Sequence, residues 1–130
     1  MLTAIGLQVI NRVYCGLATV INIIHLKINK MNAKNELLQE LEGKNIKCAQ
    51  IAHDYYRMEK KEINLKVNFS ENDFKEFLNK LDFEYDDGFG TQELHGLVWL
   101  EDGTWLSRHE YDGAENWEHN KLPEIPTELL

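Results

Sequence analysis

The chain has 130 residues, which is enough for one domain with its own hydrophobic core. Its two cysteines, Cys15 and Cys48, are not at a metal-binding or redox spacing, so the composition favours a reduced intracellular protein over a disulfide scaffold. The formal net charge of −8 argues against direct binding to the phosphates of a nucleic acid.

The charge is distributed unevenly along the chain. Residues 1–30 carry three basic residues and no acidic one, and residues 31–80 carry nine of each. Residues 81–130 carry thirteen acidic residues against two basic ones. A surface with this charge would repel a phosphate backbone and attract a basic protein surface. The simpler alternative is that the charge only keeps a small domain soluble.

The first 30 residues differ in character from the rest. Their longest apolar run, Val13 to Ile21, is too short to cross a bilayer, so we do not expect a membrane partner, although a weak signal anchor is an alternative. The composition changes abruptly at Met31, which predicts an apolar extension over residues 1–30 and a single domain over residues 31–130. The extension is either an upstream in-frame addition or a helix or hairpin that packs on the domain.

A helix and two strands are predicted first in the domain. Leucines at positions 37, 38 and 41 have helical spacing, and Gly43 follows where a helix would end. Residues 45–56 and 63–69 alternate as half-buried strands do, with Ile46, Cys48 and Gln50 on one side. The charged segment between these strands predicts the tip of a hairpin.

A second helix should begin at Ser70, which forms a capping box with Asp73. Its sheet-facing stripe consists of Phe74, Phe77, Leu78 and Leu81. Residues 83–85 predict a further strand, followed by a glycine-rich loop over residues 86–90.

The pair Asp102-Gly103 predicts a two-residue type I′ hairpin. That loop would place Trp99 opposite Leu106, and His95 opposite Glu110. The whole pattern predicts an α+β fold, in which two helices pack on one face of a mainly antiparallel sheet of about five strands.

No known catalytic or metal-binding motif is present. The chain lacks HExxH, HxH and CxxC spacings, and the loop at Gly88 and Gly90 lacks the basic residue or helix start of a phosphate-binding loop. We therefore favour a non-enzymatic protein without a metal or cofactor. The alternative is a small metal-assisted hydrolase or a ligand-binding protein that uses a histidine cluster, namely His95, His109, Glu110 and His119.

Aromatic residues are interleaved with the acidic ones. They exceed what a small core can bury, and exposed Trp and Tyr side chains are typical anchors of protein interfaces. Trp99 and Trp105 would fit a core equally well, and Trp117 could hold the C-terminal tail. The predicted partner-binding residues are Glu84, Tyr85, Asp86, Asp87, Glu101, Asp102, Trp105, Glu110, Tyr111, Asp112, Glu115, Trp117 and Glu118.

The C-terminal half contains FEYDDGFGTQELHG and then VWLEDGTWLSRHEYDGAENWEHNKLPEIP. Over residues 31–130 this resembles a group of small proteins encoded by bacteriophages and prophages, with a DGTW hairpin, an EYDG turn and a closing PxIP. The resemblance implies a phage accessory protein in the bacterial cytoplasm. Among small acidic proteins of that origin, inhibitors of host defence are frequent, including anti-CRISPR proteins and nucleic-acid mimics.

The resemblance and the charge together predict a protein that binds and blocks a basic host protein. The nucleic-acid channel of a defence nuclease is one such target. A homodimer is also compatible with the sequence. The resemblance assigns no role to any individual residue.

Overall fold

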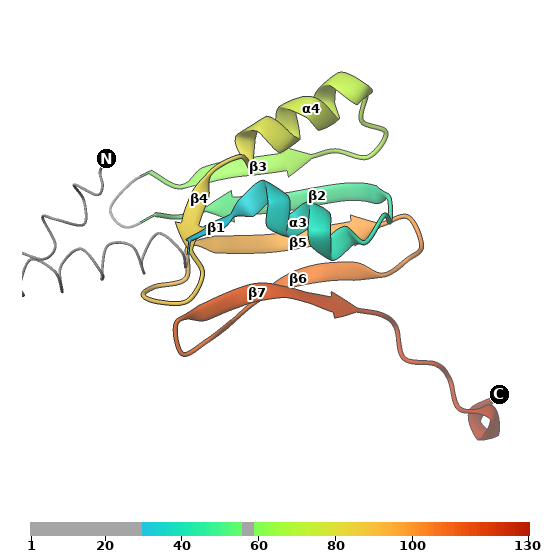
Figure 1. The fold of residues 1–130 in the computed structure, drawn as a ribbon. Coiled ribbons are helices and arrows are strands. Elements are labelled where there is room, and N and C mark those ends of the chain that lie inside the picture. Colours follow the sequence, from blue (N-terminus) through green and yellow to red (C-terminus); the bar gives the residue numbers. More distant parts are fainter. Residues whose placement is uncertain (1–29, 56–58) are drawn as a thin grey trace, which may run out of the picture. The chain divides into compact units, whose positions relative to one another are not determined.

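A five-stranded antiparallel sheet forms the centre of the fold (Figure 1). The structure is a computed structural model and describes residues 30–55 and 59–130. Residues 31–130 form one compact unit. The order of strands across the sheet is β3 (Lys61–Leu65), β2 (Ile46–His53), β5 (Leu94–Leu100), β6 (Trp105–Tyr111) and β7 (Ala114–Asn120).

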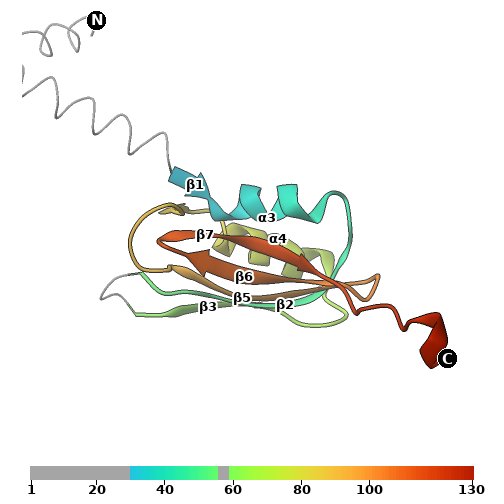
Figure 2. The ribbon, with the colours of Figure 1, turned by 90° about the horizontal axis from the view of Figure 1, so that it is seen from below.

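Two helices, α3 (Ala33–Leu41) and α4 (Glu71–Lys80), lie on one face of this sheet, as Figure 2 shows. A separate two-stranded sheet pairs β1 (Lys30–Asn32) with β4 (Glu84–Asp86), and a short 3-10 helix, η1 (Thr127–Leu129), lies near the C-terminus. The predicted α+β fold is therefore confirmed. The helix or hairpin predicted for the first 30 residues lies outside the described residues.

Both helices begin at a side chain that caps their first turn. The side-chain oxygen of Asn32 accepts a hydrogen bond from the backbone N–H of Asn35 at 2.9 Å, which starts α3. At α4 the predicted capping box is confirmed, because the side chains of Ser70 and Asp73 each accept the other's backbone N–H at 3.0 Å. The helix α3 ends at Leu41, and its C-cap residue Glu42 adopts a left-handed conformation with a φ of 50°.

The core lies between the helices and the inner face of the sheet. The sheet and α3 contribute fully buried apolar side chains, among them Leu37, Ile51, Val98 and Leu106. The stripe predicted on α4 packs against them through buried Phe77 and Leu81 and through partly buried Phe74 and Leu78. The inner face of the sheet is thus covered by the helices and buried. The opposite, outer face carries the remaining side chains of the strands.

A β-bulge changes the face on which the β2 side chains lie. Between Ile46 and Cys48 the pairing with β5 shifts by one residue. Ile46 is buried, but beyond the bulge the buried side chains are Ala49 and Ile51, whereas Gln50 is exposed. The prediction that Ile46, Cys48 and Gln50 share one side of the strand is therefore wrong.

The predicted strand over residues 63–69 also differs from the structure. It corresponds to β3, which ends at Leu65. Val67 is 51% exposed, and Asn68 adopts a positive φ of 59° that an extended strand does not allow. The chain thus turns toward α4 earlier than the alternating pattern predicts.

The positions of two strands differ from the prediction. The strand expected at residues 83–85 is β4, which belongs to the two-stranded sheet. The fifth strand of the main sheet is β7, which we did not predict. Its positions on the inner face are Glu115, Trp117 and His119, so it lacks the apolar alternation that identifies a half-buried strand.

The second Asp-Gly pair forms the two-residue hairpin between β6 and β7. Asp112 and Gly113 both have positive φ angles, 51° and 90°, and the flanking residues Tyr111 and Ala114 pair directly. Positive φ at both central residues is the property of a type I′ turn. This short loop continues the twist of the two strands without a bulge.

The first Asp-Gly pair forms a longer loop between β5 and β6. Only Gly103 of the pair has a positive φ, 87°, and the N–H of Leu100 donates to the carbonyl of Thr104 at 2.9 Å. These features describe a three-residue loop with glycine in the left-handed position. The predicted two-residue type I′ turn at Asp102-Gly103 is therefore wrong.

This extra loop residue shifts the pairing of the hairpin by one position. Trp99 pairs with Trp105, and Val98 pairs with Leu106. A shift of one residue moves side chains to the opposite face of a strand pair. Val98 and Leu106 consequently meet in the core, and the two tryptophans occupy opposed positions on the outer face.

Candidate functional site

Three of the predicted partner-binding residues are buried in the domain. Tyr85 is 1% exposed, Trp117 is 3% exposed and Glu115 is 4% exposed. A partner at the surface cannot bind side chains that are buried so deeply. The prediction that these three residues bind a partner is corrected: they stabilise the fold.

The three buried residues surround Arg108, whose side chain is 1% exposed. Its guanidinium donates hydrogen bonds to Glu36 at 3.0 Å, to the Tyr85 hydroxyl at 2.8 Å and to Glu115 at 2.7 Å. The Tyr85 hydroxyl donates in turn to Glu36. The guanidinium also lies 4.9 Å from the ring centroid of Trp117, at a distance that allows a cation–π interaction. This buried network joins α3, β4, β6 and β7.

Glu115 also accepts hydrogen bonds from the backbone of a neighbouring loop. Its carboxylate accepts the backbone N–H groups of Glu93 and Leu94 at 2.8 and 3.0 Å. It thereby attaches the end of the β4–β5 loop to β7. The predicted binding residue is thus a structural carboxylate that fixes the loop beside it.

Burial shifts the pKa values of two groups of the network, Glu36 and Tyr85. It raises the pKa of Glu36, against the opposing effect of the hydrogen bonds from Tyr85 and Arg108. It also raises the pKa of the Tyr85 hydroxyl far above its ordinary value, so this group stays protonated and keeps its role as a donor. Because the network is enclosed, a substrate cannot reach these groups.

Two predicted carboxylates, Glu101 and Asp102, lie at the β5–β6 turn. Asp102 accepts hydrogen bonds from the hydroxyl and the backbone N–H of Thr104 and lies 3.4 Å from the ammonium group of Lys44. The Thr104 hydrogen bonds, and then Lys44, lower the pKa of Asp102. The charge of Asp102 is therefore already matched within the domain.

The opposite end of the sheet presents acidic and aromatic side chains together. There the β4–β5 loop lies beside the β6–β7 turn (Figure 1), and the N–H of Glu115 donates to the carbonyl of Asp87 at 2.8 Å. The backbone of Phe89 comes within 3.5 Å of the position that a side chain on Gly113 would take. This surface, the acidic end, consists of Asp86, Asp87, Phe89, Glu110, Tyr111 and Asp112.

Two aromatic rings of the acidic end extend into solvent. Phe89 is 78% exposed and Tyr111 is 76% exposed. Phe89 was not among the predicted binding residues. The sequence does contain a signal for it, because an aromatic residue between two glycines belongs to no alternating strand that could bury it.

The carboxylates of the acidic end form no ion pair within the described part of the chain. No Lys, Arg or His nitrogen of residues 30–55 and 59–130 lies within 4 Å of Asp86, Asp87, Glu110 or Asp112. Partial burial, and then the carboxylate of Asp86, raise the pKa of Asp87. These four groups concentrate negative charge around the two exposed rings.

The remaining predicted binding residues lie elsewhere. Glu84 is exposed on β4. Trp105 and Glu118 lie on the outer face of the sheet, where Trp105 is half-buried beside Trp99 and Glu118 lies 3.6 Å from His109. The predicted residues therefore do not form one continuous face, because they divide among the core, the two ends of the sheet and its outer face.

The alternative histidine site does not assemble. His119 lies on the inner face of β7 opposite Leu106 and contacts Glu40 at 3.3 Å. The shifted hairpin register also separates His95 from Glu110, which pairs with Glu115. Within the described residues, no group of three or more His, Cys, Asp or Glu side chains is placed to hold a metal ion.

Among residues 30–55 and 59–130, no helix combines the length and apolarity that a membrane span needs.

Comparisons with known proteins found no matching family model, no matching curated protein and no matching solved structure. The candidate site therefore rests on the geometry and charge of the acidic end.

Proposed function

We propose that the protein is a binding protein that recognises a basic surface of another protein through its acidic end. The observation that carries this proposal is the exposure of Phe89 and Tyr111, 78% and 76%, among four carboxylates without a described ion-pair partner. Large rings that leave water on binding contribute favourable free energy, and aromatic residues are frequent hot spots of interfaces. The carboxylates would attract the partner and orient its approach.

The backbone around these rings is held in place before binding. The carboxylate of Asp86 accepts the N–H of Gly88 at 3.0 Å, and that of Glu110 accepts the N–H of Gly113 at 2.9 Å. The bond from Glu115 to the Asp87 carbonyl joins the loop to the sheet. A surface that is ordered in the free protein loses little conformational entropy when it binds.

The charge selects the class of partner. A nucleic acid would be repelled by the acidic end, whereas a protein surface that itself binds nucleic acid is basic and would be attracted. The proposed partner is a host protein with such a surface, for example a defence nuclease in the bacterial cytoplasm, in line with what the charge and the resemblance to phage proteins together predict. The protein would act by occupying this surface, without an enzymatic reaction.

The proposal can be tested by affinity capture from a bacterial lysate followed by kinetics with the purified partner. The test variant is D86N/D87N/E110Q/D112N, because amides keep the size and acceptor oxygens of the four carboxylates but remove their charge. The matched control is E76Q/E101Q/E124Q/E128Q, which removes four exposed carboxylates outside the acidic end.

We expect the test variant to associate with the partner about tenfold more slowly than the control at low salt, since charge steers association. The variant F89A/Y111A should instead dissociate faster, because it removes contact area that is buried only in the complex. Equal rates for the two four-site variants, or binding that does not change with salt, would contradict the proposed role of the acidic end.

A further inference from the structure

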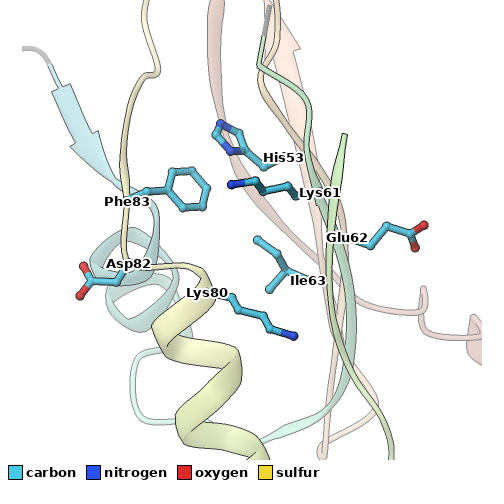
Figure 3. A pocket seen from close by; sticks show the side chains of 7 residues that line it. All are labelled: His53, Lys61, Glu62, Ile63, Lys80, Asp82 and Phe83. Carbon is cyan, nitrogen blue, oxygen red and sulfur yellow. The ribbon is translucent and has the colours of Figure 1, made fainter. Parts of the chain in front are cut away.

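A pocket of about 500 Å³ opens beside β3 at the C-terminal end of α4 (Figure 3). The strand β3 and the last residue of β2 form one wall, and α4 with the segment that follows it forms the other. The volume lies within the range of small-molecule binding sites. None of the described residues that line this pocket belongs to the acidic end.

The inside of the pocket is apolar and aromatic. Ile63 is 3% exposed and forms part of the wall. The ring of Phe83 stacks on the imidazole of His53, with centroids 4.1 Å apart and an angle of 19° between the planes. The imidazole is held by the carboxylate of Glu93, 3.1 Å from its Nε2. The stack and the contact with Glu93 therefore fix the position of the Phe83 ring, which lines the pocket and has the flat shape that packs on planar ligands.

Two ammonium groups flank this apolar surface. Lys61 extends across the pocket toward Phe83, and Lys80 enters from the end of α4 (Figure 3). No carboxylate among residues 30–55 and 59–130 lies within 4 Å of either ammonium group.

The two acidic residues at the rim do not compensate this charge. Glu62 extends from the other side of β3 (Figure 3). Asp82 extends away from the pocket, where its carboxylate binds Asn32 at 2.9 Å and Lys34 at 3.3 Å. The pocket therefore combines positive charge with a flat apolar wall in a protein whose net charge is −8.

We propose that this pocket binds a small organic anion that carries a flat ring. The ring would pack against Phe83 and Ile63, and the anionic group would lie between the ammonium groups of Lys61 and Lys80. Lysine is a mobile point charge that accommodates a carboxylate as well as a phosphate. An aryl carboxylate and a nucleoside monophosphate share this chemistry.

The experiment is calorimetric titration of the full chain with two charged probes, 2-naphthoate and adenosine 5′-monophosphate. Their uncharged counterparts, 2-naphthamide and adenosine, test whether the anionic group is needed. The variant K61Q/K80Q removes both pocket charges, and K47Q/K75Q removes two other exposed lysine charges as a control. Thermal melts of both variants establish that they fold, which we expect because all four lysines are exposed.

We expect at least one charged probe to bind, and the probe that binds identifies the anionic group as a carboxylate or a phosphate. K61Q/K80Q should weaken its binding about tenfold, because it removes both positive charges that attract the anionic group. K47Q/K75Q should leave the affinity unchanged, and the uncharged counterpart should bind as weakly as the charged probe binds to K61Q/K80Q. The proposal is overturned if neither charged probe binds, or if both lysine variants bind the probe equally.

Discussion

Arg108 and Glu115 form an ion pair of 2.7 Å in which each side chain is only 1% exposed. They lie on neighbouring strands, β6 and β7, and Glu115 is the first inward-facing residue of β7. This pair explains how a strand with mainly polar inward positions joins the sheet. The buried charge of Arg108 is matched by two carboxylates, and Glu115 also binds the preceding loop.

Replacing Arg108 with methionine should reduce the free energy of unfolding by about 3–5 kcal/mol. The substitution leaves the carboxylates of Glu36 and Glu115 buried without their cation, which is the costly way to break a buried ion pair. Urea denaturation at neutral pH measures the loss. The variant R108K keeps the charge with fewer donors and should lie between methionine and arginine. An R108M protein as stable as the unmodified protein would show that the network contributes nothing.

Replacing Asp87 with asparagine should stabilise the protein at neutral pH and have less effect in acid. The pKa of Asp87 is raised above its ordinary value of 3.8 in the folded protein. Between pH 3.8 and this higher folded-state pKa, the folded state therefore binds more protons than the unfolded state. Stability therefore falls as pH rises through this window, and the asparagine variant avoids that fall. Unfolding curves measured below and above the window give the comparison.

Asp102 provides a control of opposite sign. Its pKa is lowered by Thr104, so its ionised form contributes stability that is present above pH 3.8 and is lost as pH falls through the folded-state value. D102N should therefore destabilise the protein at neutral pH, with a difference that shrinks in acid. For each variant, the measured quantity is the difference in free energy of unfolding from the unmodified protein. If this difference changes with pH in the same direction for D87N and D102N, the directions assigned to the two pKa shifts are wrong.

Replacing Gly96 with alanine should cost about 3 kcal/mol or more. A Cβ at this position would lie 2.3 Å from the carbonyl oxygen of Gln50 and 2.8 Å from the Cα of Ile51, and the φ of 145° is unfavourable for alanine. Gly43 is the matched control, because it has a positive φ of 82° but open space around it. G43A should cost only about 1 kcal/mol. Equal losses in thermal denaturation would mean that β2 and β5 are not so close at Gly96.

The pairing of Trp99 with Trp105 can be measured by a double-mutant cycle. Alanine substitutions at these positions should show a coupling energy of about 0.2–1 kcal/mol, as expected for side chains at directly opposed positions of two paired strands. The cycle between Trp99 and Leu106 should give a coupling close to zero, because Leu106 lies on the inner face. The reverse result would support the two-residue turn that the sequence predicts.

Residues 31–130 produced alone should unfold in one cooperative transition. The compact unit begins at Met31, and both capped helices and all five strands of the main sheet lie within it. Urea denaturation followed by circular dichroism and by tryptophan fluorescence should give coincident curves. An aggregated product, or curves that differ between the two probes, would show that the first 30 residues are needed for the core.

The sequence alone determined the features that depend on neighbouring residues. The capping box at Ser70 and the apolar stripe from Phe74 to Leu81 define α4, and the leucines before Gly43 define α3. The presence of a hairpin around Asp102-Gly103 also follows from the sequence, since turn formation is a local property. Together these elements were enough to predict two helices on a mainly antiparallel sheet.

The tertiary structure decided which side chains meet and which reach the surface. Asp-Gly suits both a two-residue and a three-residue loop, so only the pairing of β5 with its neighbours fixes the register that brings Trp99 to Trp105. Arg108 on the neighbouring strand compensates the buried Glu115 of β7, and the same guanidinium reaches the more distant Glu36 and Tyr85, which are buried with it. A sequence does not show which of its charged and aromatic side chains are buried, because burial depends on contacts between segments that are far apart in the chain.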